Sequence, residues 1–106
     1  MIRLAAILAL VLAQTTLAVA AGVPRFDIKA TCRQAQPLSG SGDKNVYQGC
    51  VDSEVEARKQ LAKLWRSFKD SSRRSCVSET QIGGVPSYVD LLSCLQLDKE
   101  AGSLPQ

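Results

Sequence analysis

Apolar residues recur at helical spacing in one long stretch of the chain, from Val46 to Phe68. Residues three and four positions apart lie on one face of an α-helix. The residues that share this face are Tyr47, Cys50, Glu54, Ala57, Leu61, Leu64, Trp65 and Phe68. Asp43 or Asn45 is placed to cap the first turn, and Asn45 with Gln48 resembles a capping box. The pattern predicts a long amphipathic helix that serves as the spine of the fold.

A shorter pattern before this stretch predicts a helix of two turns over residues 27–36. Asp27 stands near its start, where an acidic side chain can cap the backbone, and Pro37 follows its end, where a helix stops. Residues 38–43 contain two Gly and two Ser, which is typical of a loop. A short helix therefore precedes the long one and is separated from it by a loop.

The basic stretch after Phe68 changes the pattern and predicts a second short helix. Ser71 or Ser72 can cap it, and it runs to about Thr80 before Gly83 and Gly84 end it. These features place a third helical element directly after the spine.

A last helix is predicted from Tyr88 to about Glu100. Ser87 and Asp90 have the spacing of a capping box, with Asp in the acidic position. Four residues at helical spacing form its apolar face: Tyr88, Leu91, Leu92 and Leu95. Gly102 and Pro105 indicate a frayed tail beyond it. With this helix the fold class is all-α: a small bundle of one long, one medium and two short helices.

The first 20 residues have the pattern of a signal peptide. Arg3 supplies the positive charge, residues 4–12 are apolar, and Ala18-Val19-Ala20 offers small residues for cleavage after Ala20. Cleavage after Ala21 or Gly22 is the next choice, and a retained anchor helix over residues 4–23 is the alternative. We expect a periplasmic or secreted domain of residues 21–106, with residues 21–25 as a flexible N-terminus and an ordered core of about residues 27–100.

Length and charge narrow the class of protein. The chain has 106 residues, enough for one domain, and carries 13 Lys and Arg against 10 Asp and Glu. Removal of Arg3 leaves 12 basic residues, so the exported chain is close to neutral. A balance of this kind argues against dedicated nucleic-acid binding.

Four cysteines follow the signal segment, and in an oxidising compartment they favour two disulfides. A continuous helix from Cys50 to Lys69 spans about 29 Å. The return to Cys76 reaches only about 23 Å, which disfavours a bridge between Cys50 and Cys76. Two pairings remain: Cys32–Cys50 with Cys76–Cys94, which we prefer, or Cys32–Cys76 with Cys50–Cys94.

Several kinds of chemistry lack their usual residues. The chain has no His, which removes the common general base and the commonest metal ligand. No C-x-x-C motif and no phosphate-binding G-x-x-x-x-G-K-[ST] motif is present. We therefore predict no catalytic residue, no cofactor and no metal site, and we expect a protein that is not an enzyme.

Two charged features remain as candidates for a role. Glu54 and Arg58 are four residues apart, which predicts an ion pair on the helix at the rim of the core, with the stem of Arg58 packed on Trp65. Bases gather late in the spine and beyond it, and this order matches the helix dipole. A possible interaction surface within this basic run consists of Arg66, Lys69, Arg73 and Arg74.

Trp65 and Phe68 are interleaved with this basic run. We interpret both as core residues. If they were exposed, they would form an aromatic patch for a partner.

The motifs together resemble a family of small exported four-cysteine bacterial proteins without an assigned function. The resemblance covers roughly residues 27–100 and is carried by Cys50-x-x-x-Glu54, Cys76-Val77 and the turn Pro86-Ser87-Tyr88 before Cys94. It implies export, four cysteines and a helical domain, and it brings no ligand or catalytic residue.

The function that we expect from the sequence is binding. The leading hypothesis is a non-catalytic exported protein that binds another protein of the cell envelope. The alternative is peripheral binding to an anionic membrane surface through the basic segment from Arg58 to Arg74.

Overall fold

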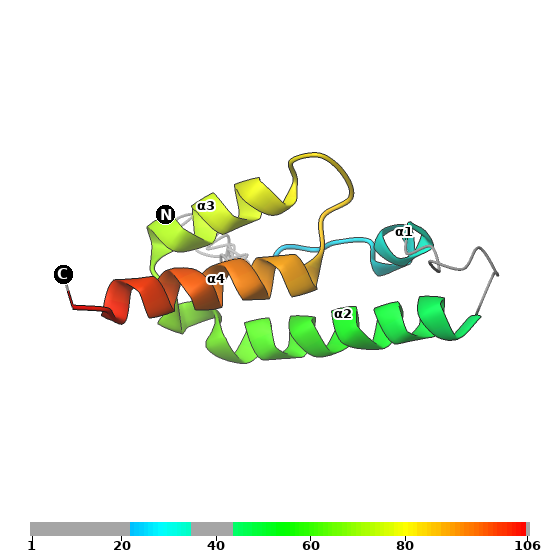
Figure 1. The fold of residues 1–106 in the computed structure, drawn as a ribbon, viewed down its shortest axis with the longest axis horizontal. Coiled ribbons are helices and arrows are strands. Elements are labelled where there is room, and N and C mark those ends of the chain that lie inside the picture. Colours follow the sequence, from blue (N-terminus) through cyan, green and yellow to red (C-terminus); the bar gives the residue numbers. More distant parts are fainter. Residues whose placement is uncertain (1–21, 35–43, 106) are drawn as a thin grey trace, which may run out of the picture.

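The computed structural model describes residues 22–34 and 44–105, and every regular element in these residues is helical. The elements are α1 (Ile28–Arg33), α2 (Lys44–Leu64), the short 3₁₀ turn η1 (Trp65–Ser67), α3 (Asp70–Thr80) and α4 (Tyr88–Ser103). Figure 1 shows them in this order along the chain. The predicted all-α fold with one long, one medium and two short helices is confirmed.

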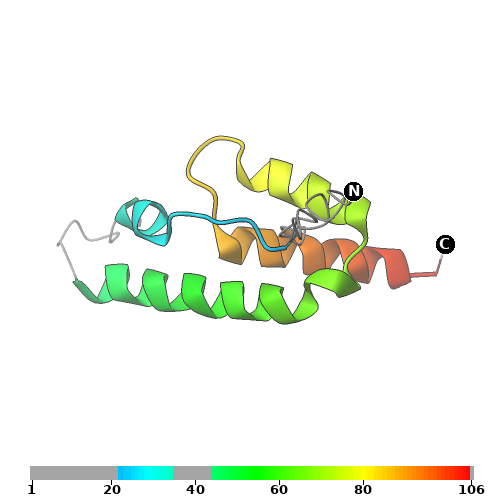
Figure 2. The same ribbon diagram turned by 180° about the vertical axis from the view of Figure 1, so that it is seen from behind.

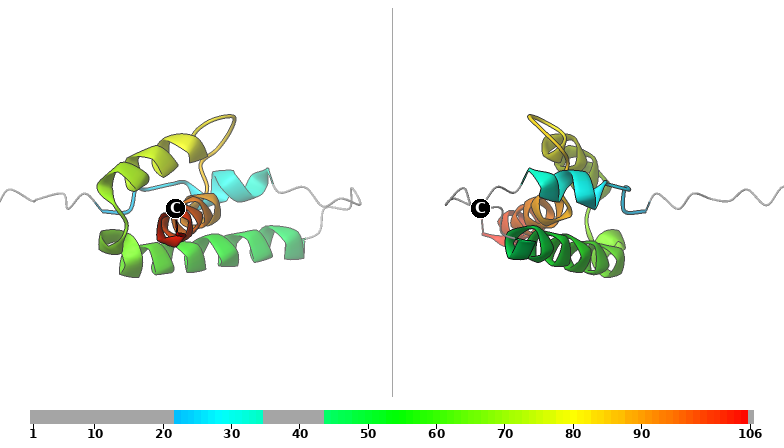
Figure 3. Two further views of the ribbon diagram at one scale, coloured as in Figure 1. Left: turned by 60° about the vertical axis from the view of Figure 1, so that its left-hand side comes forward. Right: turned by 90° about the vertical axis from the view of Figure 1, so that its right-hand side faces the viewer.

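The helices α2 and α4 lie side by side and run in the same direction (Figure 1). The helix α3, which stands between them in the sequence, runs in the opposite direction. The shared direction of α2 and α4 follows from contacts: Glu54 in the middle of α2 meets Tyr88 at the start of α4, and Phe68 after α2 meets Lys99 late in α4. Seen end-on in Figure 3, α4 lies between α2 and α3. The helix α4 is therefore the central one.

The core lies where α2, η1 and α3 meet α4. Leu61, Leu91 and Leu95 are completely buried. The cluster around them consists of Ala57, Trp65, Phe68, Cys76, Tyr88 and Leu92. The apolar faces predicted for the spine and for the last helix both point into this core. On the spine, Leu64 is 37% exposed at the end of α2, and Tyr47 and Cys50 lie outside the core cluster.

An extended segment, residues 22–27, runs alongside α4 and completes the core (Figure 2). Val23 and Phe26 pack against the buried cluster, and the Phe26 ring lies 4.8 Å from the Tyr88 ring. The backbone N–H of Phe26 donates to the hydroxyl of Tyr88, and that hydroxyl donates to the Pro24 carbonyl, both at 2.9 Å. The expectation of a flexible segment over residues 21–25 is therefore wrong for Val23 and Pro24, which belong to the folded unit.

Two disulfides join neighbouring elements. Cys32 of α1 bonds to Cys50 of α2 with Cα atoms 5.5 Å apart, and Cys76 of α3 bonds to Cys94 of α4 with Cα atoms 5.7 Å apart. These are the two bridges of the preferred pairing. Each bridge joins cysteines 18 positions apart, and a closed loop of about this length is worth about 3 kcal/mol in the chain-entropy description.

Helix starts agree with the sequence where a side chain caps them. Asp27 is the N-cap of α1, and its carboxylate accepts a hydrogen bond from the N–H of Ala30 at 3.1 Å. In α2, Asn45 lies inside the helix rather than at its cap, because the helix begins at Lys44. Asp43, Pro37 and the loop of residues 38–43 lie outside the described residues.

The short helix α3 begins earlier than predicted. Its N-cap is Lys69, whose side chain makes no capping bond, so Ser71 and Ser72 lie in the first turn rather than at the cap. After α3, Gly83 has φ of 81°, a left-handed conformation that glycine adopts without strain. The helix α4 extends to Ser103, so Gly102 belongs to the helix rather than to a frayed tail.

Candidate functional site

Glu54 is buried on α2 and points at the start of α4. Only 3% of it is exposed. Its carboxylate accepts hydrogen bonds from the Ser87 hydroxyl at 2.5 Å, the Tyr88 N–H at 2.7 Å and the Val89 N–H at 3.4 Å. The N-terminus of a helix carries unpaired N–H groups and a partial positive charge, which a carboxylate satisfies. Glu54 therefore joins the spine to the central helix.

The ion pair expected between Glu54 and Arg58 does not form, and that prediction is wrong. Among the described residues the ion pairs are those of Asp70 with two arginines. The start of α4 offers the Glu54 carboxylate three donors, while the guanidinium of Arg58 lies 5.9 Å from the centre of the Tyr88 ring. The guanidinium of Arg73 lies over the Trp65 ring, at 5.6 Å from its centre.

Ser87 caps α4 as predicted, but the capping box is only half formed. The Ser87 hydroxyl oxygen accepts the N–H of Asp90 at 3.2 Å. The reciprocal bond is missing, because the Ser87 N–H donates to the hydroxyl oxygen of Thr80 at 3.1 Å instead. Throughout residues 22–34 and 44–105, every buried side-chain nitrogen or oxygen has a partner. The cluster around Glu54 therefore holds three helices together, and no buried polar side-chain atom of the described residues is left without a partner.

The four basic residues of the predicted interaction surface fall into two groups. Arg73 and Arg74 both pair with Asp70, at 3.5 and 2.7 Å, so their charge is partly neutralised within α3. Arg66 on η1 and Lys69 before α3 are exposed and form no ion pair with a described carboxylate. The predicted surface is thus divided, and Arg66 and Lys69 are the two residues whose charge no described carboxylate neutralises.

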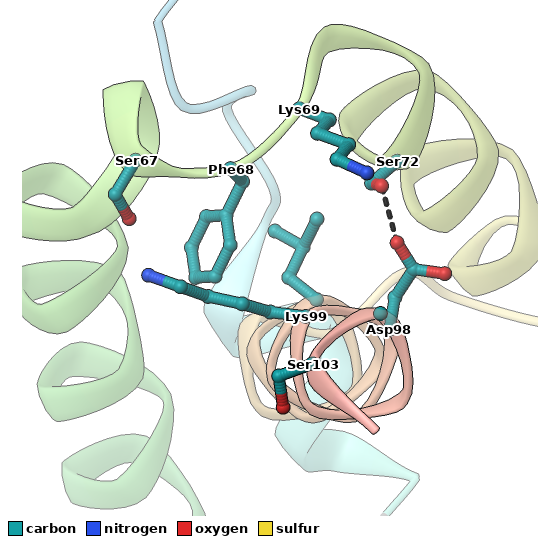
Figure 4. Close-up of a pocket in the computed structure, with 9 residues that line it drawn as sticks. Ser67, Phe68, Lys69, Ser72, Asp98, Lys99 and Ser103 are labelled. Carbon is teal, nitrogen blue, oxygen red and sulfur yellow. Dashed lines mark hydrogen bonds between the residues drawn. The ribbon is translucent and has the colours of Figure 1, made fainter. Parts of the chain in front are cut away.

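A pocket of about 230 Å³ lies beside this second group, at the end of the molecule where η1, α3 and α4 meet. Its floor is formed by the buried side chains of Phe68 and Leu95. The other residues that line it are Ser67, Lys69, Ser72, Asp98, Lys99, Gly102 and Ser103. Figure 4 shows the side chains that line the pocket.

Two ammonium groups stand at this pocket. Lys99 extends past Phe68, with its nitrogen 5.7 Å from the ring centre, and Lys69 lies beside Ser72 (Figure 4). Asp98 also lines the pocket, but its carboxylate accepts a hydrogen bond from the Ser72 hydroxyl. We call Arg66, Lys69 and Lys99 the basic corner.

The sequence pointed to two members of the basic corner and missed the third. Lys99 stands 30 positions after Lys69, in a helix whose other charges are acidic, and no local pattern connects the two residues. The parallel packing of α2 and α4 places Lys99 at the same end of the molecule as Lys69. The hydrophobic face of α4 carries the only sequence signal, because Lys99 follows Leu92 and Leu95 at helical spacing.

Trp65 and Phe68 are buried, with 8% and 5% of each residue exposed. They belong to the core, as interpreted from the sequence, and an exposed aromatic patch for a partner does not exist at these two residues.

Two general features of the described residues also bear on the site. None of the described helices combines the length and the apolar character needed to cross a membrane. In the same residues, no group of three or more His, Cys, Asp or Glu side chains is placed to hold a metal ion.

The fold and the bridges define the class: a small all-α protein stapled by two disulfides, which fits an oxidising, exported environment. No protein-family model, curated protein or solved structure matches the chain.

Proposed function

We propose that this chain is a non-catalytic exported protein that acts by binding another protein of the cell envelope. The observation that supports the proposal is the basic corner. Lys69 and Lys99 come from different elements and reach the same pocket with no carboxylate paired to either of them. A stapled scaffold that holds such groups in place loses little conformational entropy on binding.

Export is the second part of the proposal. The pattern of residues 1–20 supports a cleaved signal peptide, although these residues lie outside the described ones. The two disulfides are compatible with this location because such bonds persist in oxidising compartments. The resemblance to small exported four-cysteine bacterial proteins is part of the same proposal.

Binding to an anionic membrane surface is the second candidate, and the exposed charges of the basic corner are the observation in its favour. Interfacial binding usually combines such charges with apolar side chains that enter the bilayer. Trp65 and Phe68, the aromatic residues of this segment, are buried and do not project. The basic segment thus supplies charge for this candidate, while its two aromatic residues supply no insertion, and we place protein binding first.

Site-specific photo-crosslinking in the envelope fraction tests the proposal. A photoreactive residue replaces Ser67, which is exposed at the pocket, and in a control protein it replaces Ser53, which is exposed on α2 away from the basic corner. We expect a discrete crosslinked protein from the Ser67 position and a weak or different pattern from the Ser53 position. The same pattern from both positions, or no crosslinked protein, would contradict binding through this corner.

Vesicle sedimentation tests the membrane candidate. Vesicles rich in phosphatidylglycerol are compared with neutral vesicles at low and high salt. The membrane candidate requires salt-sensitive binding to the anionic vesicles alone, and we expect the protein to remain in the supernatant with both.

A further inference from the structure

We infer that the pocket of the basic corner takes an acidic segment of a protein partner in which a carboxylate stands beside an aliphatic side chain. The inference rests on the proposed function and specifies the chemistry of the partner. Three properties of the pocket support it: its charge, its floor and its size.

Charge comes first. Lys69 and Lys99 line the pocket, and neither forms an ion pair with a described carboxylate. The one acid of the lining, Asp98, is held by the hydroxyl of Ser72. Arg66 adds a third exposed cation in the turn next to Ser67. Complementary charge selects partners and accelerates encounter, so a carboxylate is the group that this corner favours.

The floor of the pocket adds a requirement beyond charge. More of the exposed surface that lines the pocket is apolar than polar, and the buried side chains of Phe68 and Leu95 lie beneath it. A purely ionic ligand leaves such a floor uncovered. An aliphatic side chain placed on it gains the hydrophobic contribution of the buried area. The ligand thus needs an apolar group close to its carboxylate.

Size separates a peptide segment from a free metabolite. The pocket holds about 230 Å³, whereas sites for small organic ligands usually enclose about 300–1,000 Å³. A volume of this size suits one side chain whose backbone stays outside.

Three short dye-labelled peptides test the chemistry by fluorescence anisotropy. One alternates glutamate and leucine, one alternates lysine and leucine, and one alternates glutamate and serine. We expect binding of the glutamate–leucine peptide that weakens with salt, and at least about tenfold weaker binding of the other two. Equal binding of the glutamate–serine peptide would overturn the requirement for an aliphatic side chain.

A charge-reversal pair tests which cations take part. The double variant Lys69→Glu/Lys99→Glu should bind the glutamate–leucine peptide at least about tenfold more weakly. The control double variant Lys29→Glu/Lys59→Glu changes the net charge equally at exposed positions outside the pocket lining. We expect the control to retain most of the affinity. Equal losses in both variants would show attraction by net charge alone and would overturn the site.

Gly102 allows the pocket to be filled without disturbing the fold. It lines the pocket inside α4, and a Cβ added to it meets no heavy atom within 4 Å. Gly102→Leu should therefore fold normally and lose at least about tenfold in affinity for the glutamate–leucine peptide. Gly49→Leu is the matched control, because Gly49 lies in α2 and has the same open space around its Cβ position. Unchanged affinity of Gly102→Leu would overturn the inference.

The outcomes also separate this inference from the proposed function. If the peptide binds as described while the Ser67 position crosslinks no envelope protein, the pocket chemistry stands and the proposed function fails. If an envelope protein is crosslinked equally with and without Gly102→Leu, the function stands and this inference fails. Tighter binding of phosphatidylglycerol vesicles, or self-association that Gly102→Leu abolishes, would assign the pocket to a membrane or to a second copy and would overturn it.

Discussion

Glu54 has the same role at the start of α4 that a bound anion has at a helix N-terminus in many proteins. Its carboxylate accepts three hydrogen bonds, from the hydroxyl of Ser87 and from the first backbone N–H groups of the helix. Because α4 is the central helix, this contact contributes to the arrangement of the whole bundle, together with the leucine core and the bridge from Cys76 to Cys94. The contact replaces water around a buried charge with fixed donors.

Replacement of Glu54 by Ala should destabilise the protein by about 2–4 kcal/mol, because three donors at the start of α4 lose a charged acceptor inside the fold. Urea unfolding followed by Trp65 fluorescence measures the change. Glu56→Ala is the control, since Glu56 is exposed on the same helix and should shift stability by no more than about 0.5 kcal/mol. A similar small shift in Glu54→Ala would contradict the capping role.

The sequence showed that Glu54 is unusual but not which group it contacts. It lies on the apolar face of the spine, which indicates a buried acid. The rule for residues four positions apart then assigned it to Arg58, because such rules consider only neighbours on one helix. Its actual donors lie 33 to 35 positions away. Whether Glu54 contacts a local or a distant partner depends on how the helices pack, and the sequence does not show this.

The helix α3 contributes little buried apolar area to the core. Of its 11 residues, Cys76 alone is fully buried, and Val77 packs partly against the cluster. The bridge from Cys76 to Cys94 therefore supplies much of what holds this helix on α4. Helices with little buried apolar area open first in local unfolding.

Removal of this bridge should release α3 while α2 and α4 remain paired. In the variant Cys76→Ala/Cys94→Ala we expect amide hydrogen exchange of residues 70–80 to accelerate at least about tenfold, with smaller changes in residues 54–64. The variant Cys32→Ala/Cys50→Ala is the comparison, because its bridge holds α1 instead. Equal acceleration over all helices would show that the unit unfolds as a whole and would contradict a separately opening α3.

At the level of elements the sequence was informative where periodicity is strong. The apolar faces of α2 and α4 are long enough to predict both helices, and Asp27 and Ser87 cap the helices that they were expected to cap. The start of α3 was predicted too late. Its N-cap, Lys69, makes no side-chain capping bond, whereas Ser71 and Ser72 in the first turn are residue types that often cap helices. A helix end that lacks a side-chain cap gives no signal in the sequence.

On the scale of the whole molecule, residues 22–27 close the fold from the N-terminal side. The Phe26 ring lies against the Tyr88 ring, and the backbone N–H of Phe26 donates to the Tyr88 hydroxyl, while Val23 packs on the same core. This segment has no periodic pattern, so the sequence predicted a flexible tail for part of it. The basic corner could not be predicted from the sequence either, because Lys99 joins it only through the parallel packing of α2 and α4.

A Phe26→Ala substitution should lower the free energy of unfolding by about 1–3 kcal/mol, because it removes a half-buried ring and its contact with Tyr88. Thermal unfolding followed by circular dichroism measures it. Val89→Ala removes an exposed apolar side chain of α4 and should have little effect. If both variants unfold at the same temperature as the wild type, the segment does not contribute to the stability of the core.

The pairing of each cysteine with the next one along the chain affects the order in which the fold can be completed. A polypeptide that enters an oxidising compartment N-terminus first presents Cys32 and Cys50 before the second pair arrives, so each bridge can form between the two most recent thiols. No thiol has to wait for a distant partner or exchange it later. The contact of Phe26 with Tyr88, 62 positions further on, has to wait until most of the chain has arrived. Oxidation can therefore follow translocation step by step, whereas closure of the core is a late event.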